Sequence, residues 1–284
     1  MAKLSKAQAK AHQQACELLQ KDVLSEDDKL FVLENWQESA SHINTVAGAF
    51  FTPLELAMDL AIEAHEGRVI DLCAGIGMLS FAMRQRNPFN TSALDITCVE
   101  INPDYVAVGR KILPEAKWIQ ASVFDVLGMG LGHFDFAVSN PPFGKITRPD
   151  GKKGPRYTGA EFEFHVIDIA AHLASYGVFI LPQMSAGFNY SGKPGYSRQM
   201  SGKAFEFQQK TGLTFEAGCG VDTAFYQDKW RAVAPLCEIV CVEFGEKAVE
   251  PIKEIPSALT DRPPTPTTKA SRSVGQLNLF GDAA

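Results

Sequence analysis

The sequence lacks a long apolar run, a secretory leader and a paired cysteine motif. Its richest apolar stretch, residues 169–181, is interrupted by His172 and Ser175 and falls short of the roughly 18 residues that a membrane span requires. The first residues, MAKLSKAQAKAHQQ, have no apolar core, so we expect no cleavable signal there. The six cysteines show neither a CxxC pair nor an extracellular spacing. We therefore expect a cytoplasmic protein with reduced thiols and no membrane partner.

The sequence also lacks an excess of positive charge. Its 27 lysine and arginine residues face 33 aspartate and glutamate residues, which gives a formal net charge of −6. Taken alone, this balance argues against a polyanionic partner such as a nucleic acid. The 284 residues are 45% hydrophobic and 21% charged, an ordinary globular composition that excludes fibrous and wholly disordered classes.

Short apolar runs alternate with helical patterns over most of the chain. We expect helices at 54–64, 78–85, from Asn102 onward and at 161–175, and strands at 68–72, 96–101, 118–123, 134–139, 177–181, 214–217 and 239–244. This alternation predicts an α/β fold with a mostly parallel sheet and helices on both faces. Ligands of such sheets bind beyond the carboxyl ends of the strands, so the chemistry should lie at that edge.

Three segments flank this predicted catalytic domain, which we place at residues 46–247. Residues 1–45 contain two amphipathic helices, at about 5–22 and from Ser25 to about Trp36. These helices either pack over the sheet edge, cap the substrate or form the contact of a homodimer. Residues 251–275 are rich in proline, serine and threonine, which predicts a linker. The linker leads to an apolar peptide at 276–280.

Residues 71–77, Asp-Leu-Cys-Ala-Gly-Ile-Gly, end one predicted strand and begin a helix. Glycines at such a turn let the backbone approach a ligand, and the helix N-terminus offers N–H groups to a carboxylate or phosphate. Ser80 stands where the dinucleotide-binding fingerprint has its third glycine. Glu100, at the end of the next strand, is suited to hold a ribose diol with either kind of cofactor. A tight turn without a ligand is the alternative.

A second polar turn follows the predicted strand at 134–139. Asn140-Pro141-Pro142-Phe143 combines an amide, two prolines and an aromatic ring. The prolines fix the backbone and remove two donors, which leaves the Asn140 side-chain oxygen and the Pro141 carbonyl as acceptors aimed at one spot. Such a turn is suited to hold an exocyclic amine.

These two motifs occur with Val-Glu-Ile-Asn at 99–102 and Phe-Phe-Thr-Pro at 50–53. Together they resemble the motifs of class I S-adenosylmethionine-dependent methyltransferases over roughly residues 46–245. Within that class the sequence is most similar to the N6-adenine DNA methyltransferases, of the solitary bacterial or phage type. The resemblance implies a Rossmann-like seven-stranded sheet, S-adenosylmethionine as the cofactor, and sequence-specific methylation of a flipped-out adenine in double-stranded DNA.

The resemblance also implies roles for individual residues. Residues 140–143 would form the catalytic turn, with Phe143 stacked on the flipped base. Either Ser122 or Asp125 would contact the cofactor adenine, because this chain has Ala-Ser where the family usually has Gly-Asp. The residues expected to bind the cofactor are Phe51, Thr52, Pro53, Asp71, Ala74, Gly75, Gly77, Glu100, Ile101, Ser122, Val123 and Asn140.

Three other classes of protein share the Asn-Pro-Pro turn or the fold. Ribosomal RNA methyltransferases that act on N6 of adenine or N2 of guanine often have phenylalanine after the prolines, and they are the main alternative. Release-factor glutamine methyltransferases usually have tyrosine at that position. A non-catalytic nucleic-acid-binding module is disfavoured, because every motif of the chemistry is intact.

Two loops near the catalytic turn are basic. Residues 144–156 and 187–203 contain eight basic residues and one acid, with aromatic residues in the second loop. Basic side chains neutralise phosphates and aromatic side chains stack on bases, so we expect both loops to contact DNA; solvated surface loops are the alternative. The expected nucleic-acid contacts are Lys145, Arg148, Lys152, Lys153, Arg156, Tyr190, Lys193, Tyr196, Arg198 and Lys203.

The tail peptide, residues 276–280, resembles the pentapeptide with which bacterial replication and repair proteins bind the sliding clamp. Gln276, Leu277, Leu279 and Phe280 would make that contact. The linker would give them a reach of about 25 to 30 Å. Docking of the same side chains on the protein's own core and a chance match are the alternatives.

A few other residues are expected to be structural. His165 and His172 lie on one predicted helix with no third metal ligand evident, so we expect packing or surface positions and no metal site. Cys237 and Cys241 alternate with Ile239 on one face of a predicted strand, which indicates buried core thiols.

Overall fold

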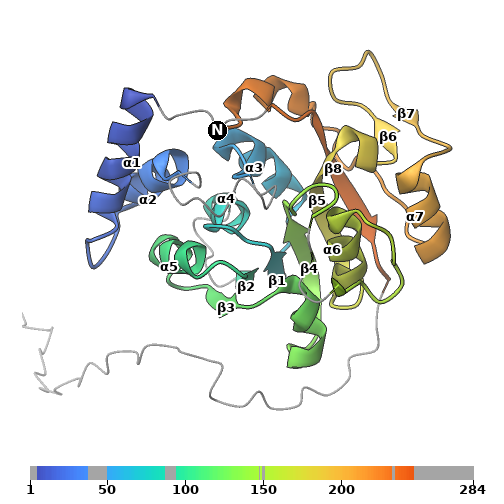
Figure 1. The fold of residues 1–284 in the computed structure, drawn as a ribbon, viewed down its shortest axis with the longest axis horizontal. Helices are drawn as coiled ribbons and strands as arrows, with labels where there is room; N and C mark the ends of the chain where they lie inside the picture. Colours follow the sequence, from blue (N-terminus) through green and yellow to red (C-terminus); the bar gives the residue numbers. More distant parts are fainter. Residues whose placement is uncertain are drawn as a thin grey trace, which may run out of the picture. The chain divides into compact units, whose positions relative to one another are not determined.

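The computed structural model describes residues 5–37, 50–86, 94–146, 148, 151–231 and 234–245. The predicted linker at 251–275 and the clamp-like peptide at 276–280 lie outside the described residues. In the described part, a central sheet carries helices on both faces (Figure 1). The predicted α/β architecture is therefore confirmed.

The sheet has six strands among the described residues. Their order is β3-β2-β1-β4-β5-β8, and every neighbouring pair is parallel except β5 and β8. The order reverses between β1 and β4, the point where ligands bind in sheets of this kind. The strands are β1 (Gly67–Leu72), β2 (Leu94–Glu100), β3 (Lys117–Gln120), β4 (Phe134–Ser139), β5 (Ala174–Pro182) and β8 (Cys237–Glu243).

Three predicted elements differ from the structure in length. The expected seventh strand, at 214–217, is reduced to one isolated bridge between Glu216 and Cys241. The helix expected at 161–175 ends at Ala170, because the chain from Ala174 onward pairs with β4. The strand expected at 118–123 ends at Gln120, and the 3-10 helix η5 (Val123–Met129) follows it.

The strands bury side chains on both faces, which explains their continuous apolar runs. Val69 and Ile70 are neighbours in β1, are fully buried, and belong to opposite core clusters. One face is covered by α3 (Leu54–Leu60), α4 (Met78–Arg86) and α5 (Pro103–Ile112), and the other by α6 (Phe162–Ala170) and α7 (Lys203–Thr211). Short elements complete the described part: η3 (Ala61–Glu63), η7 (Gln183–Ser185), β6 (Phe188–Asn189), β7 (Ser197–Arg198) and η8 (Thr223–Lys229).

The N-terminal helices are α1 (Lys6–Leu18) and α2 (Glu26–Asn35). Ser25 and Asp28 form a capping box at the start of α2. α2 packs on the main domain, since Arg84 of α4 lies 3.0 Å from the Glu26 carboxylate. At the other end of α2, Arg231 donates a 2.6 Å hydrogen bond to the Leu33 carbonyl. α2 therefore packs against α4 and the segment at Arg231, and these contacts involve no edge strand of the sheet.

The two cysteines of β8 are core residues. Cys237 and Cys241 are buried, as predicted, and burial raises the pKa of each thiol to about 12. Such thiols stay protonated and pack as small apolar groups.

Among the described helices, none combines the length and the apolar character that a membrane crossing needs.

Candidate functional site

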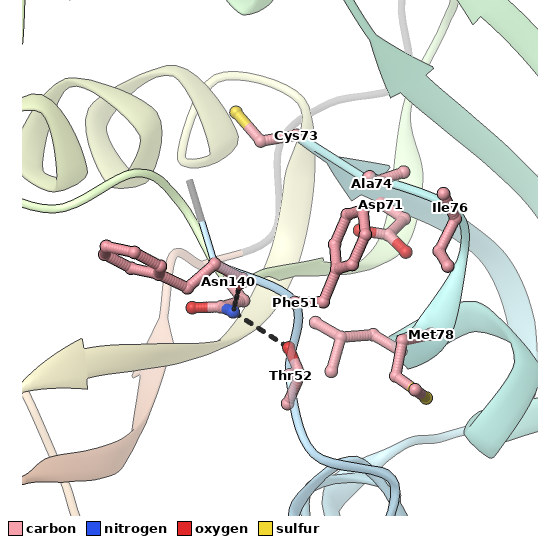
Figure 2. Close-up of a pocket in the computed structure, with 11 residues that line it drawn as sticks. Phe51, Thr52, Asp71, Cys73, Ala74, Ile76, Met78 and Asn140 are labelled. Carbon is pink, nitrogen blue, oxygen red and sulfur yellow. Dashed lines mark hydrogen bonds between the residues drawn. The ribbon is translucent and has the colours of Figure 1, made fainter. Parts of the chain in front are cut away.

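A pocket lies at the carboxyl ends of β1 and β4, the two strands between which the sheet order reverses. The pocket is partly open to solvent, and its space, open solvent included, is about 300 Å³. Six residues expected to bind the cofactor meet there, from three separate segments of the chain (Figure 2). The lining residues are Phe50, Phe51, Thr52, Asp71, Cys73, Ala74, Gly75, Ile76, Met78, Leu79 and Asn140.

The turn between β1 and α4 forms the floor of the pocket. The Ala74 N–H donates to the Val99 carbonyl of β2 at 3.0 Å, which ties the turn to the next strand. Gly75 and Gly77 have φ values of 57° and 91°, which a side chain would disfavour. A Cβ on Gly75 would also lie 3.4 Å from the ring of Phe51, so the glycine keeps the backbone close to that ring. Cys73 is the one non-glycine residue with a positive φ, 61°, among the described residues.

Two buried acids lie under this turn. The Ser80 hydroxyl donates to one oxygen of Asp71 at 2.7 Å, while the other Asp71 oxygen is buried without a hydrogen-bond partner. Burial, helped by the nearby Glu100 carboxylate, raises the pKa of Asp71 to about 7. Glu100 accepts hydrogen bonds from the N–H groups of Gly75 and Asn102 at 2.9 and 2.8 Å, and burial raises its pKa. A ligand with positive charge and donors would stabilise both carboxylates.

Asn140 follows β4 and faces the same pocket from the other side. Its amide nitrogen donates to the Phe50 carbonyl at 3.0 Å and to the Thr52 hydroxyl at 2.8 Å (Figure 2). Its amide oxygen is buried and has no hydrogen-bond partner. Since an unpaired buried acceptor costs about 1–3 kcal/mol, this oxygen is suited to a donor on a ligand. Pro141 is buried and Phe143 is half-buried, packed against the core cluster on the α3 face.

A buried glutamate that is not among the predicted site residues anchors the residue after the predicted catalytic turn. One oxygen of Glu163, in α6, accepts the Gly144 N–H at 2.8 Å, and the other accepts the Ser185 hydroxyl of η7 at 2.7 Å. Glu163 is only 1% exposed. An acid inside the apolar run Phe-Glu-Phe-His-Val-Ile is the signal that could have revealed it.

The other residues expected to bind the cofactor lie outside the lining of the pocket. Pro53 precedes α3 as its N-cap residue, and Ile101 is 56% exposed. The Ser122 hydroxyl accepts the Phe124 N–H at 3.3 Å, whereas Asp125 forms an ion pair with Lys152. Both alternatives for the adenine contact therefore stay open. Glu100 accepts the Gly75 N–H, and the Gly77 N–H donates to the Ala74 carbonyl at 2.9 Å. Val123 is buried.

Many cations of the two basic loops have partners within the chain. Arg156 pairs with the fully buried Asp168 at 2.8 Å, and Arg148 contacts His165. Arg148 and Arg156 thus hold their loop on α6, and their contact with a nucleic acid stays a prediction. Ion pairs also join Lys152 to Asp125, Arg198 to Glu216 and Lys203 to Glu161.

Three of the eight basic residues, Arg148, Lys152 and Arg156, are half-buried. The other five are exposed: Lys145, Lys153, Lys193, Arg198 and Lys203. Tyr196 is 46% exposed and stacks on Phe188 with a ring separation of 5.5 Å, while Tyr190 is half-buried. The solvent-facing basic surface is therefore smaller than the residue count of the loops indicates.

His165 has a packing role, which was one of the two positions expected for it. The ring is fully buried and accepts the Gly154 N–H at 2.8 Å. Burial, together with the Arg148 guanidinium, lowers the pKa of His165 to about 4. The ring is therefore neutral at physiological pH and holds the loop after the catalytic turn on α6.

Replacing Asp168 by alanine tests this anchoring. Its carboxylate accepts the N–H groups of Arg156 and Tyr157 at 2.6 and 2.8 Å, in addition to the ion pair. We expect the free energy of unfolding, measured by urea denaturation, to fall by about 2–4 kcal/mol, because several donors lose their acceptor. Replacing Glu216, the exposed partner of Arg198, should cost less than about 1 kcal/mol. Equal losses for both variants would contradict the anchoring role.

Comparison with known proteins gives the following similarities. Residues 54–151 match the family model "Methyltransferase small domain". The chain is 36% identical over 80 residues to ribosomal RNA small subunit methyltransferase C of Shewanella amazonensis, which covers 28% of this chain and 22% of that protein. It is 33% identical over 125 residues to the enzyme of the same name from Shewanella loihica, covering 42% of this chain and 35% of that protein. The chain thus spans about a third or less of the length of these relatives.

Two solved structures share the fold. A protein of Listeria monocytogenes, described as a class I S-adenosylmethionine-dependent methyltransferase, is 15% identical with a TM-score of 0.53, covering 89% of this chain and 84% of that chain. The methyltransferase subunit of a type I restriction-modification system from Streptococcus thermophilus is 12% identical with a TM-score of 0.52. The match covers 77% of this chain and 48% of that chain. The described domain therefore has the class I methyltransferase fold.

This fold and the matched family model identify S-adenosylmethionine as the cofactor, as the motifs predict. The residues of the pocket fit it. Asp71 has an unpaired buried oxygen and Glu100 a second carboxylate nearby, which suits a ligand with an ammonium group and a sulfonium charge. Because Gly75 has no side chain, the cofactor can approach the backbone of the turn closely beside the Phe51 ring. Phe51, Thr52, Asp71, the 73–77 turn and Glu100 are the residues that would hold the cofactor.

Proposed function

We propose that this protein transfers a methyl group from S-adenosylmethionine to an exocyclic amino group of a purine base in a nucleic acid. One observation carries the proposal: Asn140, which is followed by two prolines, lines the cofactor pocket, and its amide oxygen is buried without a hydrogen-bond partner. A nucleobase amine offers the N–H donors that this oxygen lacks.

The chemistry follows from the residues of the turn. An aromatic amine is a weak nucleophile because its lone pair is delocalised into the ring. Acceptance of its two N–H bonds by the Asn140 oxygen and the Pro141 carbonyl would favour a tetrahedral nitrogen with an available lone pair. The cofactor supplies an activated methyl group, so the protein's contribution is positioning. A paired base must leave its stack to reach the turn, and Phe143 is the ring on which it would then stack.

Ribosomal RNA is our first candidate substrate, because the curated relatives are named as ribosomal RNA small subunit methyltransferases. This order reverses the expectation from the motifs alone, which placed DNA first. Double-stranded DNA remains the second candidate, since the combination of Phe-Phe-Thr-Pro and Asn-Pro-Pro-Phe resembles the N6-adenine DNA methyltransferases.

Transfer of a labelled methyl group to several substrates in parallel tests the proposal. We expect incorporation into small ribosomal subunits or their free RNA, with N2-methylguanosine or N6-methyladenosine after nuclease digestion and mass spectrometry. N6-methyldeoxyadenosine from duplex DNA would instead select the second candidate. Label found only in protein glutamine would contradict the proposal, because the acceptor would then be an amide and not a nucleobase.

A further inference from the structure

The short segment ahead of α3 contacts the proposed catalytic amide directly. We propose that Thr52, together with the Phe50 carbonyl, sets the orientation of the Asn140 side chain and is thus a positioning residue for methyl transfer. The motif resemblance assigns Thr52 only to the cofactor. The inference rests on the proposed function and deepens it, since it names what holds the amide oxygen toward the acceptor base.

The chemistry of the hydrogen bonds fixes which way the amide faces. An asparagine NH2 group has two donors, and both are used here, one to the Phe50 carbonyl at 3.0 Å and one to the Thr52 hydroxyl at 2.8 Å. A carbonyl oxygen can only accept. A flipped amide would therefore place the Asn140 oxygen against the Phe50 oxygen, acceptor against acceptor. The NH2 group must face the 50–52 segment, and the amide oxygen must face away from it.

This orientation leaves the amide oxygen free as an acceptor. It is buried, has no hydrogen-bond partner, and belongs to a residue that lines the pocket. In Figure 2 the Asn140 nitrogen points along its hydrogen bonds, and the oxygen lies on the other side of the amide group. Loss of the Thr52 hydroxyl would leave one N–H without its acceptor, and the Phe50 carbonyl alone would then hold the amide less firmly.

The segment that carries Thr52 is packed into the core. Phe51, before it, is 8% exposed and packs against Trp36 of the α2 C-terminus and Tyr105 of α5, with ring separations of 5.9 and 5.1 Å. Pro53, after it, leads into α3, whose Leu56 is fully buried. Thr52 is 5% exposed. A side chain held on both sides in this way can orient a neighbour with little entropy cost.

Kinetics of two Thr52 variants separate positioning from cofactor binding. Thr52→Val keeps the shape but removes the acceptor, and we expect kcat at saturating cofactor to fall about 10- to 100-fold, because a misplaced reacting group costs rate directly. The Kd for S-adenosylmethionine, measured by calorimetry, should change less than about threefold, because Phe51, Asp71 and the 73–77 turn still line the pocket. Thr52→Ser restores the hydroxyl and should recover kcat to within about threefold of the wild type. Thr211→Val removes a buried hydroxyl of α7 outside the pocket and should leave kcat unchanged.

Three outcomes would overturn the inference. An unchanged kcat with a weakened cofactor Kd would make Thr52 a cofactor ligand only. A serine variant as slow as the valine variant would indicate packing in place of hydrogen bonding. An unchanged kcat and Kd together would leave Thr52 without a role in the reaction.

A readout that needs no substrate keeps this inference apart from the proposed function. In protein labelled with ¹⁵N asparagine, the Asn140 side-chain signal is identified by its loss in Asn140→Ala. Its two protons should exchange with solvent faster in Thr52→Val than in the wild type. That result would stand even if no nucleobase amine were methylated, in which case the proposed function alone would fail. Equal exchange rates in both proteins would contradict the orienting role.

Discussion

Replacing Asn140 by alanine is expected to lower kcat for methyl transfer by about 10²- to 10³-fold or more. The buried amide oxygen is the acceptor that would bind the amine, and loss of one preorganised polar group at a reacting centre has an effect of this size. Binding of S-adenosylmethionine should survive, weakened by less than about tenfold, because Asp71 and the glycine turn remain. Single-turnover kinetics and calorimetry measure the two quantities on the same preparation.

Asn35→Ala is a matched control for this prediction. Asn35 is a half-buried asparagine at the end of α2, and its amide donates to the Phe31 carbonyl. Its loss removes the same chemical group outside the pocket and should leave kcat unchanged. If Asn140→Ala retained a kcat within about threefold of the wild type, the amide would not be the group that binds the amine, and the proposed function would lose its central observation.

The pocket could be predicted from the sequence because each of its parts is local. The turn after β1 and the turn after β4 are each defined by a short run of glycine or proline next to an apolar strand. Parallel strands place their carboxyl ends at one edge, so two such turns on neighbouring strands must lie close together. No long-range side-chain contact is needed for that argument, and the pocket lining agrees with it.

The basic loops could not be predicted in the same way. Charge counted along residues 144–156 treats Arg156 as free, but its partner Asp168 lies in the following helix. The predicted helical pattern included both Glu163 and Asp168 without showing that these acids face the loop and hold it. Pairing of side chains across segments depends on the packing of α6 against the loop. A residue count therefore overestimates the exposed charge whenever buried acids of a neighbouring element take up the cations.

The same limit applies to the ends of elements. The segment 214–217 has the composition of a strand, yet it pairs with β8 at a single position. Strand length depends on how far a partner runs alongside, and that is a property of the assembled sheet. Ser122 is a related case, because its hydroxyl accepts the Phe124 N–H and the chain turns into η5 where the strand pattern continues.

Replacing Gly109 by alanine is expected to destabilise the protein, although helix propensity alone predicts the opposite. Alanine in a helix interior is normally more stable than glycine by about 1 kcal/mol. Here a Cβ on Gly109, in α5, would lie 2.1 Å from the Trp118 ring. That ring is 7% exposed, and its N–H donates to the Leu113 carbonyl at 3.2 Å. A Cβ on Gly77 would lie 3.2 Å from the same ring, so the backbone of Gly77 is also close to the indole.

We therefore expect Gly109→Ala to lower the free energy of unfolding by about 2–3 kcal/mol, as overpacking of a filled site does. The cofactor Kd should also rise, because a displaced Trp118 would push on the glycine turn at Gly77 that forms the pocket floor. Gly128→Ala is the control: no atom lies within 4 Å of its added Cβ, and it should change stability by less than about 0.5 kcal/mol. A Gly109→Ala protein as stable as the wild type would mean that α5 can move away from β3, and that Trp118 does not fix the distance between this helix and the cofactor turn.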